Sequence, residues 1–192
     1  MRICVFCGSS AGRSLAYGEA AAAFGALLAR EGIGLVYGGG RVGLMGAVAE
    51  AAQAAGGEVI GVIPEALATR EVAHFGLQDL RVVGSMHERK ALMSDLSDAF
   101  VALPGGIGTF EELFEMWTWA QLGLHPKPVA LLDVQGFYGG LTQFLDHVAE
   151  EGFLRAPHRA LLLVERDPIA LLARLRSHRP VTLPKLIDRS DT

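Results

Sequence analysis

A stretch from Leu103 to Glu115, LPGGIGTFEELFE, places two opposing kinds of chemistry side by side. Its glycines leave backbone N–H groups bare where a helix should begin, which favours the binding of a phosphate. Three carboxylates, Glu111, Glu112 and Glu115, follow closely, although negative charge repels a bound anion. Thr109 and Glu112 also have the spacing of a capping box, in which each side chain bonds the other's backbone N–H. Spacing alone leaves both interpretations open.

Complementary charges lie in the segment MHERKALM, from Met86 to Met93. Arg89 and Lys90 fall in the first turn of an expected helix, where cations oppose the helix dipole, so they need an anionic partner. One alternative is that Glu88 or glutamates of the next helix pair with them on the surface. If both helices begin at the same sheet edge, the two cations and the glycine loop can bind one anionic ligand together.

Short apolar runs alternate with segments of helical period, which is typical of a parallel sheet covered on both faces. We expect strands at Arg2–Cys7, Gly34–Tyr37, Val59–Ile63, Leu80–Val83, Ala99–Leu103, Val129–Leu132 and Leu161–Val164. We expect helices near Ser14–Glu31, Gly43–Ala55, His87–Ser97, Thr109–Leu122, Phe137–Glu151 and Pro168–Ser177. Right-handed crossovers give an α/β fold, a Rossmann-like doubly wound parallel sheet with helices on both faces. We predict one nucleotide-binding domain over residues 1–179 and a C-terminal tail over residues 180–192.

Three of the turns that leave these strands are rich in glycine: CGSSAG, YGGGRVGLMG and LPGGIGTFEE. Glycine often serves only a tight turn between a strand and a helix. Open sheets of this kind bind ligands beyond the carboxyl ends of their strands, however, and all three turns lie at that edge. Together they predict a crevice that binds an anion.

The second turn matches the dinucleotide fingerprint G-x-G-x-x-G at Gly38, Gly40 and Gly43. That fingerprint normally follows the first strand, and an acidic residue at the end of the next strand holds the ribose. Here the next strand ends in Pro64, and Glu65 lies too far along. We therefore expect no dinucleotide and no other cofactor, and the sequence has no P-loop.

Composition narrows the classes of partner. The net charge of −4 and the absence of a basic run interleaved with aromatics disfavour nucleic acid. No apolar stretch reaches the ~20 residues that span a bilayer, and the start of the chain has no signal-peptide pattern, so we expect a cytoplasmic protein without a membrane partner. Cys4 and Cys7 form a C-x-x-C, but within a strand they point to opposite faces, and we predict no metal site.

The motifs carry a family resemblance. PGGIGTFEE resembles the PGGxGTxxE motif of the LOG family, and MHERK resembles its companion motif; similarity extends to GSS, YGGGRVGLMG, TWAQLG and EEGF, over roughly residues 1 to 155. The resemblance implies a Rossmann-like homodimer that acts as a cytokinin riboside 5′-monophosphate phosphoribohydrolase. Such enzymes cleave an N-glycosidic bond to free an adenine-type base and ribose 5-phosphate. Some relatives act on AMP and some are labelled lysine decarboxylases, but no lysine here has a pyridoxal-phosphate setting.

Carried over residue by residue, the resemblance implies that Arg89 and Glu112 are the catalytic pair. A carboxylate near the sugar carbon would stabilise the positive charge that develops as the base leaves, and would orient or deprotonate water. Arg89 would either hold the phosphate or donate to the departing base. Glu111 and Glu115 are expected to serve the helix dipole and the surface. The implied substrate-binding residues are Gly8, Ser9, Gly39, Glu71, Met86, Lys90, Gly105, Gly106, Gly108, Thr109 and Thr118.

Two alternatives of function remain. The chain is either a general nucleosidase that acts on AMP and other 5′-monophosphates, or a carrier that binds a nucleotide or cofactor without catalysis. A carrier needs no carboxylate beside the sugar, so the presence of both Arg89 and Glu112 favours an enzyme.

The helix FEELFEMWTWAQLGLH is apolar nearly all round and must be covered on a second side. We expect a partner subunit near the active site to cover it, with Trp119, or alternatively Trp117, at the contact. The other interpretation is that a helix of the same chain covers this side.

Overall fold

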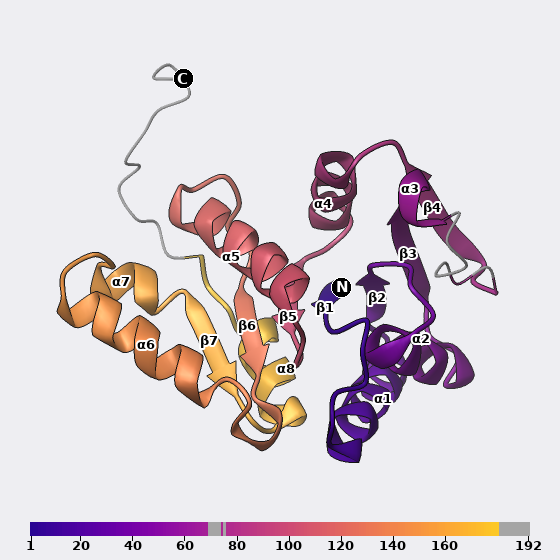
Figure 1. The fold of residues 1–192 in the computed structure, drawn as a ribbon, viewed down its shortest axis with the longest axis horizontal. Helices are drawn as coiled ribbons and strands as arrows, with labels where there is room; N and C mark the ends of the chain where they lie inside the picture. The colour runs from indigo at the N-terminus through magenta and orange to yellow at the C-terminus, as the bar shows by residue number, and fades with distance from the viewer. Residues whose placement is uncertain (69–73, 75, 181–192) are drawn as a thin grey trace.

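The computed structural model describes residues 1–68, 74 and 76–180. Seven parallel strands form one sheet in the order β4-β3-β2-β1-β5-β6-β7 (Figure 1). The strands are β1 (Arg2–Phe6), β2 (Gly34–Tyr37), β3 (Val59–Pro64), β4 (Asp79–Val83), β5 (Ala99–Ala102), β6 (Val129–Leu132) and β7 (Leu162–Glu165). The predicted fold class is confirmed.

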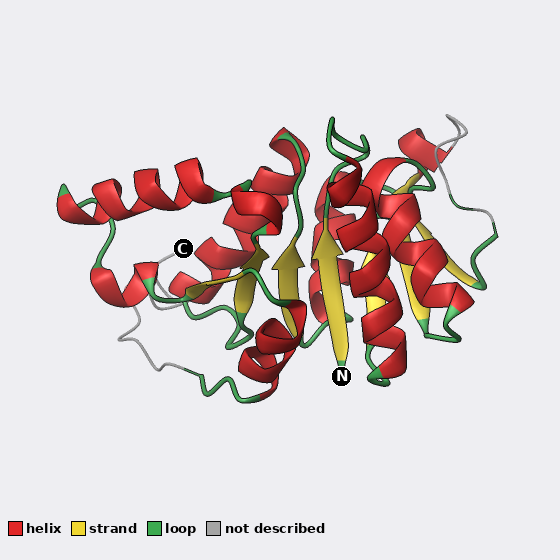
Figure 2. Cartoon of the chain, turned by 90° about the horizontal axis from the view of Figure 1, so that it is seen from below, coloured by secondary structure: helices red, strands yellow, loops and turns green. Residues whose placement is uncertain are grey.

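Helices cover both faces of the sheet (Figure 2). They are α1 (Leu15–Arg30), α2 (Gly43–Ala54), α3 (Glu65–Leu67), α4 (Met86–Asp95), α5 (Ile107–Gln121), the 3₁₀ helix η2 (Val134–Gly136), α6 (Gly139–Glu150), α7 (Ala156–Arg159) and α8 (Pro168–Arg176). Each predicted strand and helix matches an observed one with ends within two residues. Three short elements, α3, η2 and α7, escaped prediction because three or four residues are too few to show a helical period.

Alternation along the strands divides the core into two layers. Ile3 and Val5 of β1 pack with α1, α2 and α8, whereas Cys4 and Phe6 pack with α4, α5 and α6. Cys7 continues the first layer, so the two cysteines lie on opposite faces as predicted. Burial raises the pKa of both thiols.

The direction of strand order reverses between β1 and β5. The chain adds β2, β3 and β4 on one side of β1 and then returns to place β5 on the other side. In doubly wound sheets, ligands bind at the carboxyl ends of the strands that flank such a reversal. The turns after Phe6 and Ala102 therefore meet where a ligand is expected.

The N-terminus of α5 differs from the sequence prediction. Gly106 is the N-cap and has no side chain to bond the first amides, while Thr109 is already the third helical residue. The interpretation of Thr109 and Glu112 as a capping box is therefore wrong. A Cβ on Gly105 would lie 2.1 Å from the Thr109 hydroxyl oxygen, so that hydroxyl occupies the space above Gly105.

Among the helices that the structure describes, none has the length and hydropathy needed to cross a membrane. The tail prediction concerns residues that, apart from Pro180, lie outside the described part of the chain.

Candidate active site

The three glycine-rich turns pack directly on one another. The Gly8 N–H donates to the Pro104 carbonyl at 3.1 Å, and the Gly8 carbonyl accepts from the Leu44 N–H at 3.0 Å. Gly43 has a φ of +62°, and a Cβ there would lie 2.3 Å from the Ser9 carbonyl carbon. Glycine at position 43 is thus required by both backbone conformation and close packing.

The glycines of the second turn serve packing at this site. A Cβ on Gly38 would lie 2.3 Å from Nη2 of Arg89, so this glycine makes room for a guanidinium. The first amides of α2, at Leu44 and Met45, donate to the Gly8 carbonyl. Since those amides are engaged, the second turn helps to build the wall of the crevice by packing, and anion binding by the crevice stays a prediction.

The N-terminus of α5 is the helix end best suited to a phosphate. Ser14 caps α1 by accepting from Ala16, and Ser85 caps α4 by accepting from the Glu88 N–H at 3.1 Å. The N-cap of α5 is Gly106, which offers no side-chain acceptor to the first amides. An uncapped helix start combines free N–H groups with the positive end of the helix dipole.

Arg89 and Glu112 form a buried ion pair beside that helix start. Nη1 of Arg89 lies 2.5 Å from Oε1 of Glu112, and the Arg89 Nε donates to the Val62 carbonyl at 3.0 Å. The two residues are only 7% and 8% exposed, so the surface pairing considered from sequence is wrong for them. Burial raises the pKa of Glu112 above its ordinary value, and the Arg89 guanidinium opposes this shift.

Lys90 pairs with the two other glutamates of α5, Glu111 and Glu115. Its Nζ contacts Glu111 and lies 3.0 Å from Oε2 of Glu115, an ion pair rather than a well-aligned hydrogen bond. Burial lowers the pKa of Lys90, but the two glutamates outweigh burial and raise it overall. The expectation that Glu111 and Glu115 serve the helix dipole is wrong, because both lie beyond the first turn of α5 and pair with a buried lysine. The expected surface position is confirmed for Glu111, which is exposed.

A cavity of about 410 Å³ opens above the Arg89–Glu112 pair. Of the predicted residues, eight line it: Gly8, Ser9, Met86, Arg89, Gly106, Gly108, Thr109 and Glu112. Six residues of the three predicted turns also line it, although none was named as a substrate-binding residue: Cys7, Gly38, Gly40, Met45, Ile107 and Glu111. Sequence reasoning missed Ile63 and Leu67, which line it too. A signal for Ile63 exists in the sequence, since it is the last residue but one of β3 and so lies at the sheet edge where the glycine-rich turns begin.

The remaining predicted residues lie elsewhere. Gly105 lines a neighbouring apolar cavity of about 300 Å³ that shares Gly8, Ser9 and Gly106 with the first. Gly39 packs on β3, and its carbonyl accepts from the His74 N–H at 2.9 Å. Thr118 is exposed near the far end of α5. Lys90 is not among the described residues that line the cavity, and Glu71 lies outside the described residues.

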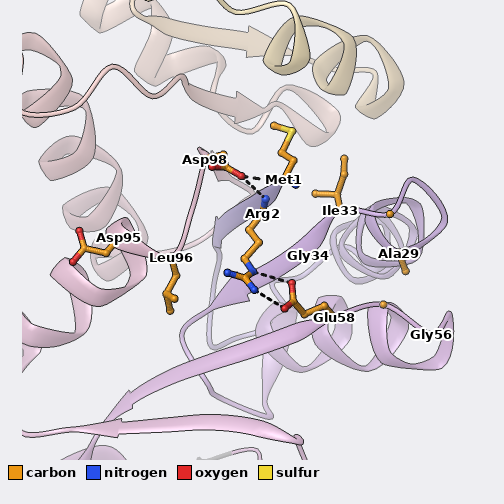
Figure 3. A pocket seen from close by; sticks show the side chains of 12 residues that line it. Met1, Arg2, Ala29, Ile33, Gly34, Gly56, Glu58, Asp95, Leu96 and Asp98 are labelled. Carbon is orange, nitrogen blue, oxygen red and sulfur yellow. Dashed lines mark hydrogen bonds and ion pairs between the residues drawn. The ribbon is translucent and has the colours of Figure 1, made fainter.

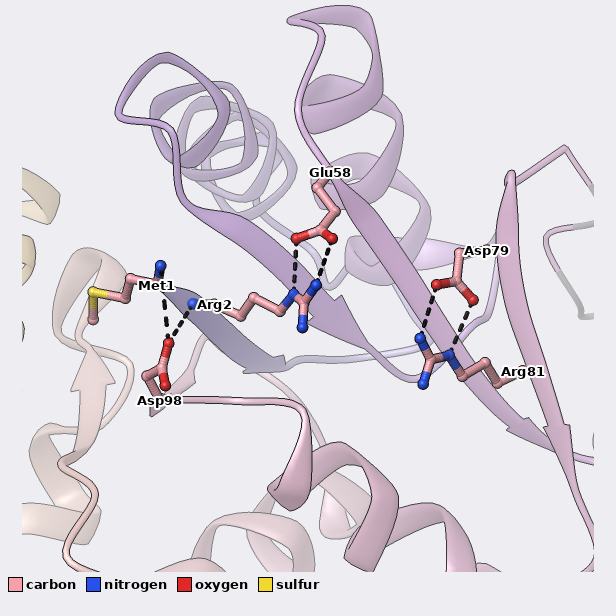
Figure 4. Close-up of polar contacts among 6 residues, drawn as sticks. All are labelled: Met1, Arg2, Glu58, Asp79, Arg81 and Asp98. Atoms are coloured by element: carbon pink, nitrogen blue, oxygen red, sulfur yellow. Dashed lines mark hydrogen bonds and ion pairs between the residues drawn. The ribbon is translucent and has the colours of Figure 1, made fainter.

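A third cavity, of about 480 Å³, lies at the opposite edge, where the strands begin (Figure 3). Arg2, Glu58 and Asp98 in its wall bind one another. Nε and Nη2 of Arg2 donate to Glu58 at 2.8 and 2.7 Å, and Asp98 accepts from the Arg2 N–H at 2.8 Å (Figure 4). Nearby on β4, Arg81 pairs with Asp79 in the same way. This edge carries mutually satisfied surface pairs, so the cavity above Glu112 is the candidate active site.

The outer side of α5 is covered in part by the same chain. Trp117 is 5% exposed, and its indole N–H donates to the His158 carbonyl of α7 at 3.0 Å. The alternative prediction, that Trp117 contacts a partner subunit, is therefore wrong. Trp119 is only partly buried and remains the candidate for that contact.

Comparison with known proteins identifies the family of this chain. A family model described as possible lysine decarboxylase matches residues 45–175. The chain is 51% identical over 180 residues to a probable cytokinin riboside 5′-monophosphate phosphoribohydrolase of Oryza sativa subsp. japonica, covering 94% of this chain and 79% of the relative. It is 50% identical over 176 residues to the cytokinin riboside 5′-monophosphate phosphoribohydrolase of Rhodococcoides fascians, covering 91% and 89%. The chain belongs to the LOG family.

Likeness among solved structures is more distant and concerns the fold alone. A molybdenum cofactor binding protein from Rippkaea orientalis superposes with a TM-score of 0.70 at 24% identity, covering 92% of this chain and 95% of that one. The two proteins share the doubly wound architecture, and the function must be argued from the site.

Proposed function

We propose that this LOG-family protein hydrolyses the N-glycosidic bond of cytokinin riboside 5′-monophosphates, which are N6-substituted forms of AMP. The products are the free base and ribose 5-phosphate. The observation that carries the proposal is the buried ion pair of Arg89 and Glu112 in the cavity wall, next to the uncapped start of α5. The phosphate of one ligand then binds at the start of α5, and its sugar lies beside the Glu112 carboxylate. This arrangement answers the conflict between glycines and glutamates in the opening stretch.

The carboxylate serves the reacting carbon. As the bond between C1′ of the ribose and the base nitrogen breaks, positive charge develops on the sugar, and Glu112 stabilises it. Water then forms the new bond to C1′ and gives up a proton, for which Glu112 is the base. The departing base takes up a proton from solvent at the nitrogen whose bond to C1′ has broken. A raised pKa makes Glu112 a better proton acceptor than an ordinary glutamate.

Arg89, like Glu112, acts at the sugar and the base of the ligand. Its guanidinium is already bound to Glu112 and to the Val62 carbonyl, so it lies beside the sugar carbon rather than at the phosphate. We assign it two tasks: to keep Glu112 ionised despite burial, and to donate a remaining N–H toward the departing base.

The phosphate belongs at Gly106–Thr109, at the start of α5, where backbone N–H groups and the helix dipole favour a dianion. The apolar wall of Met45, Ile63, Leu67 and Met86 then faces the base and its N6 substituent. At about 410 Å³ the cavity falls in the range typical of sites for small organic molecules.

Comparative turnover tests this proposal against its alternatives. Purified protein is given N6-isopentenyladenosine 5′-monophosphate, AMP, CMP and UMP at matched concentrations, and base release is measured. We expect the highest kcat/KM with the N6-substituted nucleotide. Equal rates with AMP would identify a general nucleosidase instead, and tight binding of every nucleotide without base release would identify a carrier.

We also propose that the protein is a homodimer in which Trp119 contacts the partner subunit near the site. Support comes from the partly exposed apolar surface of α5 that α7 leaves uncovered. The cytoplasmic location and the lack of a nucleic-acid partner stay predictions, and the second agrees with the net charge of −4.

A further inference from the structure

A second group of ion pairs joins α4 to α5 immediately beside the catalytic pair. Lys90 follows Arg89 along α4, and its ammonium lies between Glu111 and Glu115. Lys90 is 7% exposed, the same fraction as Arg89. The contact between α4 and α5 therefore contains four charged residues besides Glu112. Arg89 has a role in the proposed reaction, whereas the other three, Lys90, Glu111 and Glu115, have none.

The groups that face Glu112 come from three elements. Glu111 lies on its own helix and Arg89 and Lys90 come from α4, while the Cys4 thiol comes from β1 and the Cys7 thiol follows β1 on the other face of the sheet. Both thiols are neutral because burial raises their pKa. Glu111 raises the pKa of Glu112, whereas Arg89 and Lys90 lower it. With Lys90 removed, three carboxylates on α5 would face a single cation.

We propose that Lys90 is a positioning residue, which neutralises Glu111 and Glu115 and fixes α4 on α5 so that Glu112 stays ionised at the sugar carbon. The inference rests on the proposed function and departs from the substrate-binding role that the family resemblance implies for this lysine. Its geometry supports the departure. Lys90 already has two carboxylate partners, and moving its ammonium to a phosphate would leave both unpaired in a partly buried contact.

The pH dependence of kcat distinguishes the two roles. Lys90→Met removes the charge and keeps much of the side-chain volume. We expect the acid limb of the kcat pH profile, where kcat falls on acidification, to move to higher pH by about one unit, while KM for the nucleotide changes little. Lys90→Arg should restore the limb. The double variant Lys90→Met/Glu111→Gln should return it toward the wild-type position, because one cation and one neighbouring carboxylate are lost together.

A phosphate ligand would behave differently. A KM raised tenfold or more in Lys90→Met, with the acid limb unmoved and no rescue by Glu111→Gln, would overturn the inference. Lys127→Met is the matched control. Lys127 is another part-buried lysine bound to α4, through the Ser94 carbonyl at 2.7 Å, but it lies away from the cavity. This control should leave both KM and the acid limb unchanged.

Two further measurements keep the inference testable. If Lys90→Met does not fold, Glu111→Gln alone should move the acid limb downward, and an unmoved limb would contradict the inference. Titration of the Glu112 carboxyl carbon by NMR, assigned by its loss in Glu112→Gln, needs no turnover. An upward shift in Lys90→Met supports the role of Lys90 even if no nucleotide is hydrolysed, whereas an unchanged titration overturns it and leaves the proposed function intact.

Discussion

Replacing Gly38 with alanine tests whether the position of the Arg89 guanidinium matters. Gly38 is not in the left-handed region, so alanine fits its backbone, and the effect comes from the added methyl group. That Cβ would lie 2.3 Å from Nη2 of Arg89. Ordinary van der Waals contact needs about 3.5 Å, so the guanidinium must retreat by roughly 1 Å. Because Arg89 is bound to Glu112 at 2.5 Å, this retreat stretches or breaks the pair.

Activity should suffer more than stability. A displacement of about 1 Å at a catalytic group can cost on the order of 10²-fold in rate, and we expect kcat to fall by that factor. A long flexible side chain can move without disturbing the core, so the free energy of unfolding should fall by only about 1–3 kcal/mol, the cost of a weakened buried polar contact. Initial rates of base release and urea unfolding measure the two effects.

Gly140→Ala is the matched control. Gly140 lies in α6, and nothing lies within 4 Å of the Cβ that alanine would add there. It should keep full activity and gain up to about 1 kcal/mol from the better helix propensity of alanine. A folded Gly38→Ala variant with the activity of the control would refute the reasoning, because the position of Arg89 would then be immaterial.

Three more predictions follow from the site. In Arg89→Met the Glu112 carboxylate is left buried and unpaired, at a cost of about 3–5 kcal/mol in the free energy of unfolding. The double variant Arg89→Met/Glu112→Leu should be about as stable as the wild type and inactive. A double variant no more stable than the single one would contradict this. Since burial raises the pKa of Glu112 and the reaction needs its ionised form, kcat should decline as pH falls through a midpoint above the ordinary value of about 4.3. The contribution of Glu112 to the free energy of unfolding has the opposite pH dependence: it is greatest at low pH and declines as pH rises through the raised pKa. A kcat profile with its midpoint at or below the ordinary value would exclude the assignment of Glu112 as the base. Trp119→Glu should lower both the mass measured by light scattering and the activity, whereas Leu15→Glu, at a residue 84% exposed on α1, should change neither; an active monomeric wild type would end the dimer proposal.

The sheet could be predicted because buried parallel strands read as short continuous apolar runs. Val129–Leu132 is such a run, and its predicted ends are the observed ones. The start of α5 could not be fixed in this way, since Thr109 and Glu112 have the spacing of a cap. The observed start depends on packing between Thr109 and Gly105 and between the first and third turns.

Arg89 and Glu112 could be chosen as candidates from the family motifs, whereas the position of Arg89 at a helix start indicated only that it needs an anionic partner. The role of Lys90 could not be predicted, since it depends on how α4 is rotated against α5. Consecutive helical residues point about 100° apart, so Arg89 and Lys90 cannot both face one small ligand. The structure directs Arg89 to Glu112 and Lys90 to Glu111 and Glu115.

Product analysis tests the central claim most directly. Wild-type protein and Glu112→Gln are incubated with N6-isopentenyladenosine 5′-monophosphate, and free base and ribose 5-phosphate are quantified by mass spectrometry. We expect wild type to release the two products in equal amounts, and Glu112→Gln, while folded and still able to bind the nucleotide, to be slower by on the order of 10²-fold or more. Equal rates for the two proteins, or release of phosphate and nucleoside in place of base and ribose 5-phosphate, would contradict it.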